Sequence, residues 1–144
     1  METYQTAKAI LLRKTGQVLL LRRSNTHPTE ALMYDLSGGI VEPDEAADVA
    51  LAREIFEETG LKVEPHKLSL VFTRTDERKD KIAFRLVYAA LIDNEKLAVK
   101  LSWEHDKSVW LEPKAAIEKL VPGKYTQDGL RFALEHSLLS RLKA

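Results

Sequence analysis

The sequence predicts an α/β fold, a three-layer α/β/α sandwich in which helices cover both faces of a mixed β-sheet. Segments with the two-residue alternation of strands occupy the beginning and the middle of the chain. A segment with helical spacing separates them, and helical spacing returns towards the C-terminal end. This order of strands, helix, strands and helices favours a sheet that is covered on both sides.

The length and composition are those of a globular protein. The 144 residues match one ordinary domain, and we expect residues 1–144 to form a single domain. The hydrophobic content of 44% and charged content of 31% exclude a disordered or collagen-like chain. No apolar run approaches the roughly 20 residues of a membrane span, and Met1–Thr6 lacks a secretory pattern. We therefore expect a cytoplasmic protein without a membrane partner.

The charges and the absence of cysteine narrow the chemistry. Lysine and arginine number 22, as do aspartate and glutamate, so no global basic field would attract nucleic acid. We expect no nucleic-acid partner, and a phosphate-containing ligand would need a local site. Without cysteine, disulfides, thiolate catalysis and cysteine-ligated zinc are excluded.

The first strands are predicted from apolar, β-rich runs. Ala7–Arg13 and Gln17–Arg23 are separated by Lys14–Gly16, which predicts a hairpin. Ser24–Ala31 is polar, contains a proline and is expected to be a loop. Met33–Gly39 is predicted as a short strand that ends at a glycine pair.

The most clearly predicted helix follows this pair. Asp44–Thr59 lacks glycine and proline, places Ala46, Val49 and Ile55 at helical spacing, and stops before Gly60.

The second half of the chain continues with strands and ends in helices. Alternation around Leu68–Phe72 and a longer run at Ile82–Ile92 predict two strands that pair across a charged turn. Val109–Leu111 is predicted as a short strand, followed by a helix over Glu112–Leu120. A final helix is predicted over Gln127–Leu142.

Residues 39–61 carry a spaced pattern of glycines, acids and one arginine. Its members are Gly39, Glu45, Arg53, Glu54, Ile55, Glu57, Glu58, Gly60 and Leu61. This stretch resembles the Nudix box at every defining position, as found in MutT-like hydrolases. The resemblance implies a Nudix-type sandwich with a mixed sheet. It also implies metal-dependent hydrolysis of a pyrophosphate bond in a nucleoside-diphosphate-linked substrate.

The acidic residues of this pattern predict a metal site on physical grounds as well. Glu54, Glu57 and Glu58 lie at i, i+3 and i+4, on one face of the predicted helix. Alone, such a run is more typical of a solvated surface; the full pattern favours a hard cation, Mg²⁺ or in its place Mn²⁺. The cation would neutralise phosphate charge and activate the attacking water. The resemblance adds the Gly38 carbonyl as a ligand.

The other box residues are assigned supporting roles. Arg53 cannot bind a metal, and its planar fork suits Glu45, with Glu54 as a second contact. Gly39 belongs to the pair that lets the backbone turn and approach closely. We assign Arg53, together with Glu54 and Glu57, to the catalytic set.

Two positions depart from the family's pattern. Ser37 stands where many relatives have proline, and we expect it to soften the loop without touching a ligand. Asp44 stands where glycine is frequent and adds a carboxylate near the helix N-terminus, where the helix dipole favours it.

Candidates outside the box lie in two regions. Many relatives recruit a further acid from a loop, as ligand or general base, and here we favour Glu104 over Asp106. His105 is expected to be an exposed loop residue, with a base as the alternative. Arg22 and Arg23 should point to opposite faces of a strand, and we expect Arg23 to contact phosphate.

Aromatic side chains complete the candidates for substrate binding. We expect Tyr125 to stack on a nucleobase, whereas core packing is favoured for Trp110 and Phe84. Marks of ADP-ribose and dinucleoside polyphosphate enzymes are missing at residues 76–79, so exclusion favours a nucleoside triphosphate.

Other functions stay open at this point. The main alternative is a non-catalytic Nudix-like module that binds a nucleotide or nucleotide sugar. A calcium-binding or purely structural acidic helix would not explain the glycine pair and Arg53. The attacked phosphorus, the general base, the number of metal ions and the choice between monomer and homodimer are also open.

Overall fold

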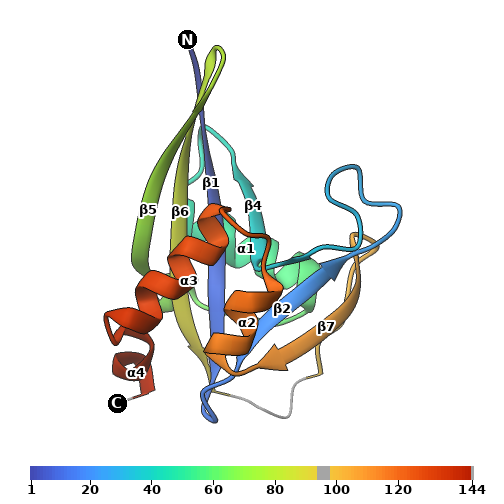
Figure 1. Cartoon of the computed structure of the whole chain (residues 1–144), viewed down its shortest axis with the longest axis vertical. Coiled ribbons are helices and arrows are strands. Elements are labelled where there is room, and N and C mark those ends of the chain that lie inside the picture. Colours follow the sequence, from blue (N-terminus) through green and yellow to red (C-terminus); the bar gives the residue numbers. More distant parts are fainter. Residues whose placement is uncertain (94–97, 144) are drawn as a thin grey trace.

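A seven-stranded mixed sheet organises the computed structural model, which describes residues 1–93 and 98–143 (Figure 1). The strands are β1 (Glu2–Arg13), β2 (Val18–Arg23), β3 (Tyr34–Asp35), β4 (Ser37–Val41), β5 (Ser69–Arg78), β6 (Lys81–Ile92) and β7 (His105–Leu111). The helices are α1 (Ala47–Thr59), α2 (Pro113–Lys119), α3 (Tyr125–Glu135) and α4 (Leu138–Lys143), with a 3-10 turn at Pro65–Lys67.

Strand β1 is the centre of the sheet. It runs parallel to β6 along its whole length, from the pair Glu2 and Lys81 to the pair Arg13 and Ile92. On its other side it pairs antiparallel with β4 and then with β2. The sheet is therefore mixed, as the sequence predicts.

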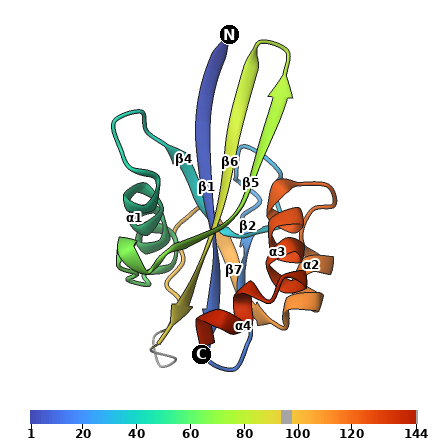
Figure 2. The same cartoon turned by 90° about the vertical axis from the view of Figure 1, so that its left-hand side faces the viewer.

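Helices cover both faces of this sheet (Figure 2). Helix α1 lies on one face, and α2, α3 and α4 lie on the other. Alternate residues of β1 serve the two layers: Ala9 and Leu11 pack in the cluster that includes α1, whereas Ile10 packs with Leu130 of α3. The predicted three-layer arrangement is confirmed, and the core lies on both sides of β1.

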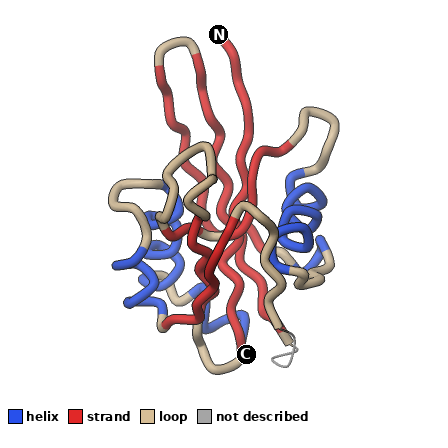
Figure 3. Tube along the Cα trace, turned by 90° about the vertical axis from the view of Figure 1, so that its right-hand side faces the viewer, coloured by secondary structure: helices blue, strands red, loops and turns tan. Residues whose placement is uncertain are grey.

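The strands β1, β5 and β6 extend beyond the helices at one end of the molecule (Figure 3). Strand β1 begins at Glu2 rather than at Ala7, because the partner strand β6 continues its pairing into the polar N-terminal residues. No helix in the two described ranges is long and apolar enough to cross a membrane.

Helix boundaries differ from the expected ones at two places. Helix α1 begins at Ala47 rather than Asp44, because a turn in which the Glu45 amide donates to the Glu42 carbonyl precedes it. The final helix is interrupted at Ser137, whose φ of 58° is left-handed, so two shorter helices form. The predicted stop of α1 at Gly60 is confirmed by its φ of 74°.

Three strands also differ from the prediction. Strand β5 continues to Arg78, into the predicted charged turn, because its pairing with β6 extends to the pair Arg78 and Lys81. The glycine pair lies inside β4 instead of ending a strand. Strand β7 begins at His105, four residues earlier than predicted, because it pairs with β2 back to Arg23.

Candidate functional site

The acidic face of α1 lies against the glycine pair of β4. Buried Leu51 and Ile55 anchor the helix on the sheet and fix which of its faces is free. A side chain at Gly39 would lie 3.3 Å from the carboxyl carbon of Glu54. A glycine there leaves room for that carboxylate beside the backbone.

Gly38 is required by its surroundings. Its φ is 143°, and a Cβ built on it would lie 2.0 Å from the carbonyl oxygen of Ala7 on β1. Only glycine fits this close approach of β4 to β1. The Gly38 peptide is thereby held with its N–H towards Glu58 and its carbonyl towards Lys8.

Glu58 is the buried end of the acidic face. It is 4% exposed, and its Oε1 accepts hydrogen bonds from the Ser37 hydroxyl at 2.7 Å and the Gly38 amide at 2.8 Å. Burial raises the pKa of Glu58 to about 7, although Lys8 and these two donors act in the opposite direction. The expectation that Ser37 touches no ligand candidate is wrong, because the hydroxyl of Ser37 points at Glu58 from the neighbouring strand.

Arg53 forms the exposed end of this acidic face. Its guanidinium donates to the Glu45 carboxylate through Nε at 3.2 Å and through Nη2 at 2.9 Å, which confirms the predicted pair. It also lies 3.4 Å from Glu54 and 3.2 Å from Glu57. The contact with Glu54 was expected, and the one with Glu57 follows from their i, i+4 spacing.

Glu54 lies between these two ends. Its pKa is raised, first by partial burial and then by the nearby charge of Glu57, while Arg53 lowers it and Glu104 adds a smaller increase. The carboxylate is therefore in an environment where an added positive charge is favourable.

The residues suit a hard divalent cation, although the three carboxylates do not form a closed set. Across residues 1–93 and 98–143, no three acidic or histidine side chains converge as a group that could hold an ion. Arg53 holds Glu54 and Glu57, while Ser37 and Gly38 hold Glu58 inwards. Carboxylate and carbonyl oxygens are nevertheless the donors that Mg²⁺ prefers, and open positions suit water and phosphate.

A buried charged group that the sequence analysis missed lies beside the glycine pair. The ammonium of Lys8 contacts Asp35 at 3.0 Å, the Leu36 carbonyl at 3.3 Å and the Gly38 carbonyl at 3.4 Å. Arg23 binds the same oxygen of Asp35 at 2.8 Å. The signal was a lysine inside the apolar run Ala7–Arg13, where an unpaired charge would be costly.

The charges of this group stabilise one another. Burial alone would lower the pKa of Lys8, but Asp35 raises it above its usual value. Burial would likewise raise the pKa of Asp35, but Lys8 and Arg23 hold it below its usual value. Two cations and one anion therefore leave a net positive charge next to Gly39.

A cleft of about 910 Å³ runs from this group towards α3. Gly39, Arg23 and Tyr125 all line it. Arg22 points to the other side and pairs with Asp106 at 2.8 Å, so the two arginines do alternate as predicted. The cleft thus joins the glycine pair to both predicted substrate-binding residues.

Tyr125 is buried in the wall of the cleft. Its phenol oxygen accepts a hydrogen bond from Thr6 at 3.0 Å, and the Arg85 guanidinium lies 5.0 Å from the centre of its ring. Arg85 covers one side of the ring, so base stacking by Tyr125 stays a prediction that requires the other side or the edge.

Glu104 lies just before β7 and close enough to Glu54 to influence its pKa. Its carboxylate is 3.6 Å from Nε2 of His27, and its backbone carbonyl accepts the Ser24 amide at 2.9 Å. Its catalytic role stays a prediction.

The predicted environments of His105 and Phe84 were wrong. His105 is 7% exposed rather than an exposed loop residue, and burial lowers its pKa to about 4, so it is unsuited to act as a base near neutral pH. Phe84 is 42% exposed rather than packed in the core. Trp110 does pack against the α1 side of the core.

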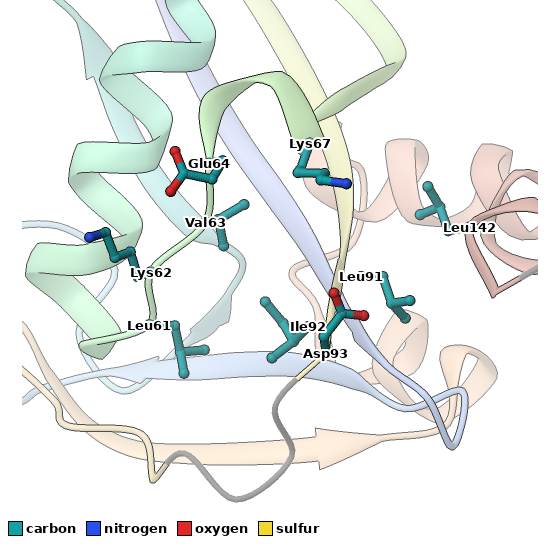
Figure 4. A pocket seen from close by; sticks show the side chains of 9 residues that line it. All are labelled: Leu61, Lys62, Val63, Glu64, Lys67, Leu91, Ile92, Asp93 and Leu142. Atoms are coloured by element: carbon teal, nitrogen blue, oxygen red, sulfur yellow. The ribbon is translucent and has the colours of Figure 1, made fainter.

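A second hollow of about 450 Å³ lies beyond the C-terminal end of α1 (Figure 4). Its lining is Leu61, Lys62, Val63, Glu64, Lys67, Leu91, Ile92, Asp93 and Leu142. No predicted site residue lines it, whereas Gly39, Arg23 and Tyr125 line the first cleft, and the glutamates of the acidic face are in the lining of neither.

Known proteins resemble this chain in sequence and in fold. A MutT-like protein of Streptomyces ambofaciens is 28% identical over 111 residues, which cover 77% of this chain and 65% of that protein. A CTP pyrophosphohydrolase of Escherichia coli is 26% identical over 76% of this chain and 77% of its own length. The crystal structure of a MutT protein from Methanosarcina mazei superimposes with a TM-score of 0.75. It is 29% identical and covers 94% of this chain and 96% of its own.

The family assignment rests on the greater part of the chain. Residues 3–128 match the NUDIX domain, a range that includes the sheet, α1, the glycine pair and the beginning of α3. This chain belongs to the NUDIX family.

Proposed function

We propose that this protein is a metal-dependent pyrophosphohydrolase that acts on a nucleoside triphosphate. The proposal rests on the position of Glu54 and Glu58 against the Gly38–Gly39 pair, beside a cleft that Gly39 lines and whose lining holds more basic than acidic residues. The family uses divalent metals in general, and we assign Mg²⁺, with Mn²⁺ as a replacement, to this chain.

The charge of the cleft suits a polyphosphate. Seven lysine or arginine residues and four acidic residues line it. Lys8 contacts the Gly38 carbonyl and shares Asp35 with Arg23, so both cations would face a phosphate chain that meets the cation at the glycine pair. Arg23 has one guanidinium nitrogen on Asp35 and another on Thr29, so it is fixed in direction.

Glu54, Glu58 and the Gly38 carbonyl would hold the cation, with Glu57 as a further ligand. When bound, it would neutralise phosphate charge and acidify the attacking water. Arg53 keeps Glu45 and the outer carboxylates in place.

Glu104 is assigned as the general base. As the water oxygen bonds to phosphorus, the bridging P–O bond breaks and the proton passes to Glu104. A nucleoside monophosphate and pyrophosphate would leave.

One relative favours a nucleotide rather than another diphosphate, because the Escherichia coli relative is a CTP pyrophosphohydrolase. The cleft volume of about 910 Å³ is within the range of small-molecule sites.

The experiment is a substrate panel with identification of the products. Purified protein with Mg²⁺ is incubated with nucleoside triphosphates, oxidised nucleotides, dinucleotides and nucleotide sugars, each also in excess chelator. We expect pyrophosphate release from at least one triphosphate and loss of turnover in chelator. Tight binding of a nucleotide or nucleotide sugar without any product would contradict the proposal and favour a non-catalytic module.

A further inference from the structure

Ser37 contacts the acidic face of α1 from the adjacent strand. It is the first residue of β4, is paired with Ala9 of β1, and is 1% exposed. Its hydroxyl donates to Oε1 of Glu58 across 2.7 Å. Pairing with β1 fixes the backbone of Ser37, so the direction of this hydroxyl is set by the sheet.

Both short hydrogen bonds to Glu58 end on the same oxygen. The Gly38 amide donates to Oε1 at 2.8 Å, next to the Ser37 hydroxyl. Two donors on one oxygen fix the rotation of a carboxylate, and hydrogen bonds to an ionised group are the stronger kind. Oε2 receives neither of these two bonds and is the oxygen left to bind another group.

The serine hydroxyl distinguishes this chain from relatives that have proline at this position. Proline, which the box pattern of many relatives has here, carries no side-chain donor. A chain with proline would hold Glu58 through the Gly38 amide without the second donor. The serine therefore adds a contact to a buried carboxylate that is 4% exposed.

We propose that Ser37 is a positioning residue that holds Oε1 of Glu58 and thereby presents Oε2 to the divalent cation. The role rests on the proposed cation site of α1. Residues that orient a metal ligand in this way affect metal affinity strongly, commonly by about 10- to 100-fold.

The test measures Mn²⁺ binding without substrate, by the electron paramagnetic resonance signal of free Mn²⁺. Ser37→Ala is expected to raise the Kd for Mn²⁺ by about tenfold. Ser24→Ala is the matched control, because Ser24 is also buried, at 7%, and its side chain bonds the Thr26 hydroxyl and no other side chain in the described part of the structure. It should leave the Kd within about twofold. Melting temperatures in chelator separate metal affinity from folding.

A second comparison keeps the test decisive if Ser37→Ala folds poorly. Ser37→Cys fills the space that Ser37→Ala leaves, with a somewhat larger thiol that is only a weak donor, so it should lose most of the same affinity. In a Glu58→Gln background, Ser37→Ala should cause no further loss, because the two residues act as one unit.

The contradicting outcomes are distinct. Unchanged Mn²⁺ affinity in folded Ser37→Ala or Ser37→Cys, or an equal loss in the Glu58→Gln background, overturns the role of Ser37 and leaves the cation site intact. Failure of the wild-type protein to bind Mn²⁺ overturns the cation site together with this role.

Discussion

Glu57 and Glu58 are neighbours in the sequence but lie in opposite environments. The side chain of Glu57 is 56% exposed and contacts Arg53, whereas Glu58 is 4% exposed and contacts Ser37 and the Gly38 amide. The inner end of the acidic face is thus held by strand β4, and the outer end by the side chain of Arg53. Backbone and side-chain hydrogen bonds from β4 orient Glu58, whereas an ion pair with Arg53 orients Glu57.

This difference separates what each end contributes to stability. Exposed ion pairs such as Arg53 with Glu57 contribute little to folding. Buried contacts at Gly38 and Glu58 cannot be removed without leaving a clash or an unpaired polar group. Changes at the inner end should therefore alter stability, and changes at the outer end should alter catalysis alone.

The largest effect is expected at Gly38. Gly38→Ala would place a Cβ 2.0 Å from the Ala7 carbonyl oxygen, so β4 must move away from β1. We expect a loss of at least about 3 kcal/mol in the free energy of unfolding, measured by denaturant titration. Gly39→Ala is the control, since its Cβ meets only the Glu54 carboxylate at 3.3 Å, and it should lose less than about 1 kcal/mol. Equal losses at both glycines would contradict the clash with Ala7 as the cause of the loss at Gly38.

The next effect concerns the outer end. Glu57→Gln should lower turnover of the panel substrate by at least about a hundredfold, because one charge leaves the metal site. The free energy of unfolding should change by under about 0.5 kcal/mol, since the side chain is exposed. Kinetics and a thermal melt on one preparation check both. Wild-type turnover in the folded variant would remove Glu57 from the catalytic set.

A smaller effect is expected at Arg53. Arg53→Lys keeps a positive charge but loses the two-nitrogen contact with Glu45, so kcat should fall by roughly tenfold. Affinity for Mn²⁺ should stay within about twofold, as measured by calorimetry. A large loss of metal affinity with unchanged kcat would show that Arg53 organises the ligands rather than the reaction.

The smallest effect is a pH dependence of the free energy of unfolding, which we assign to His105 near the buried Lys8. Burial, followed by Lys8, lowers the pKa of His105 from 6.5 to about 4. Below about pH 6.5 the unfolded chain therefore binds a proton at His105 that the native protein does not bind. The contribution of neutral His105 to stability is complete above that pH and is lost as the pH falls towards about 4. We expect His105 to contribute a loss of about 1 kcal/mol between about pH 7 and about pH 5.5, whereas Glu58, whose pKa is raised to about 7, acts in the opposite direction over this range.

The measurement is chemical denaturation of wild-type protein and His105→Gln across this range. The free energy of unfolding of the wild-type protein minus that of His105→Gln should fall by about 1 kcal/mol over this range, whereas the difference between the wild-type protein and the control His66→Gln should stay constant, because His66 is exposed. A difference between the wild-type protein and His105→Gln that does not change with pH would contradict the assignment to His105.

Local patterns predicted the layers of the fold and most of its elements. The alternation at Ala7–Arg13 and the helical spacing before Gly60 depend on neighbouring residues, and both were confirmed. The early start of β7 depends on its pairing with the distant strand β2, which no local pattern encodes. The helical spacing of Gln127–Leu142 also did not indicate the break at Ser137, whose φ is left-handed.

In the site too, contacts within one segment were predictable and contacts between distant segments were not. The pair of Arg53 with Glu45 follows from a spacing within one segment. The contact of Ser37 with Glu58 and the buried group around Lys8 join residues from different elements, so they became visible only in the folded chain. A charged residue inside an apolar strand was the one available signal.

The most direct test is a crystal soaked in Mn²⁺ and measured at a wavelength where manganese scatters anomalously. We expect an anomalous peak in contact with the Gly38 carbonyl and with a carboxylate oxygen of Glu58 or Glu54. We also expect this peak to disappear in Glu58→Gln crystals. A peak elsewhere on the chain, or an unoccupied acidic face at saturating Mn²⁺, would contradict the assignment of α1 and β4 as the catalytic metal site.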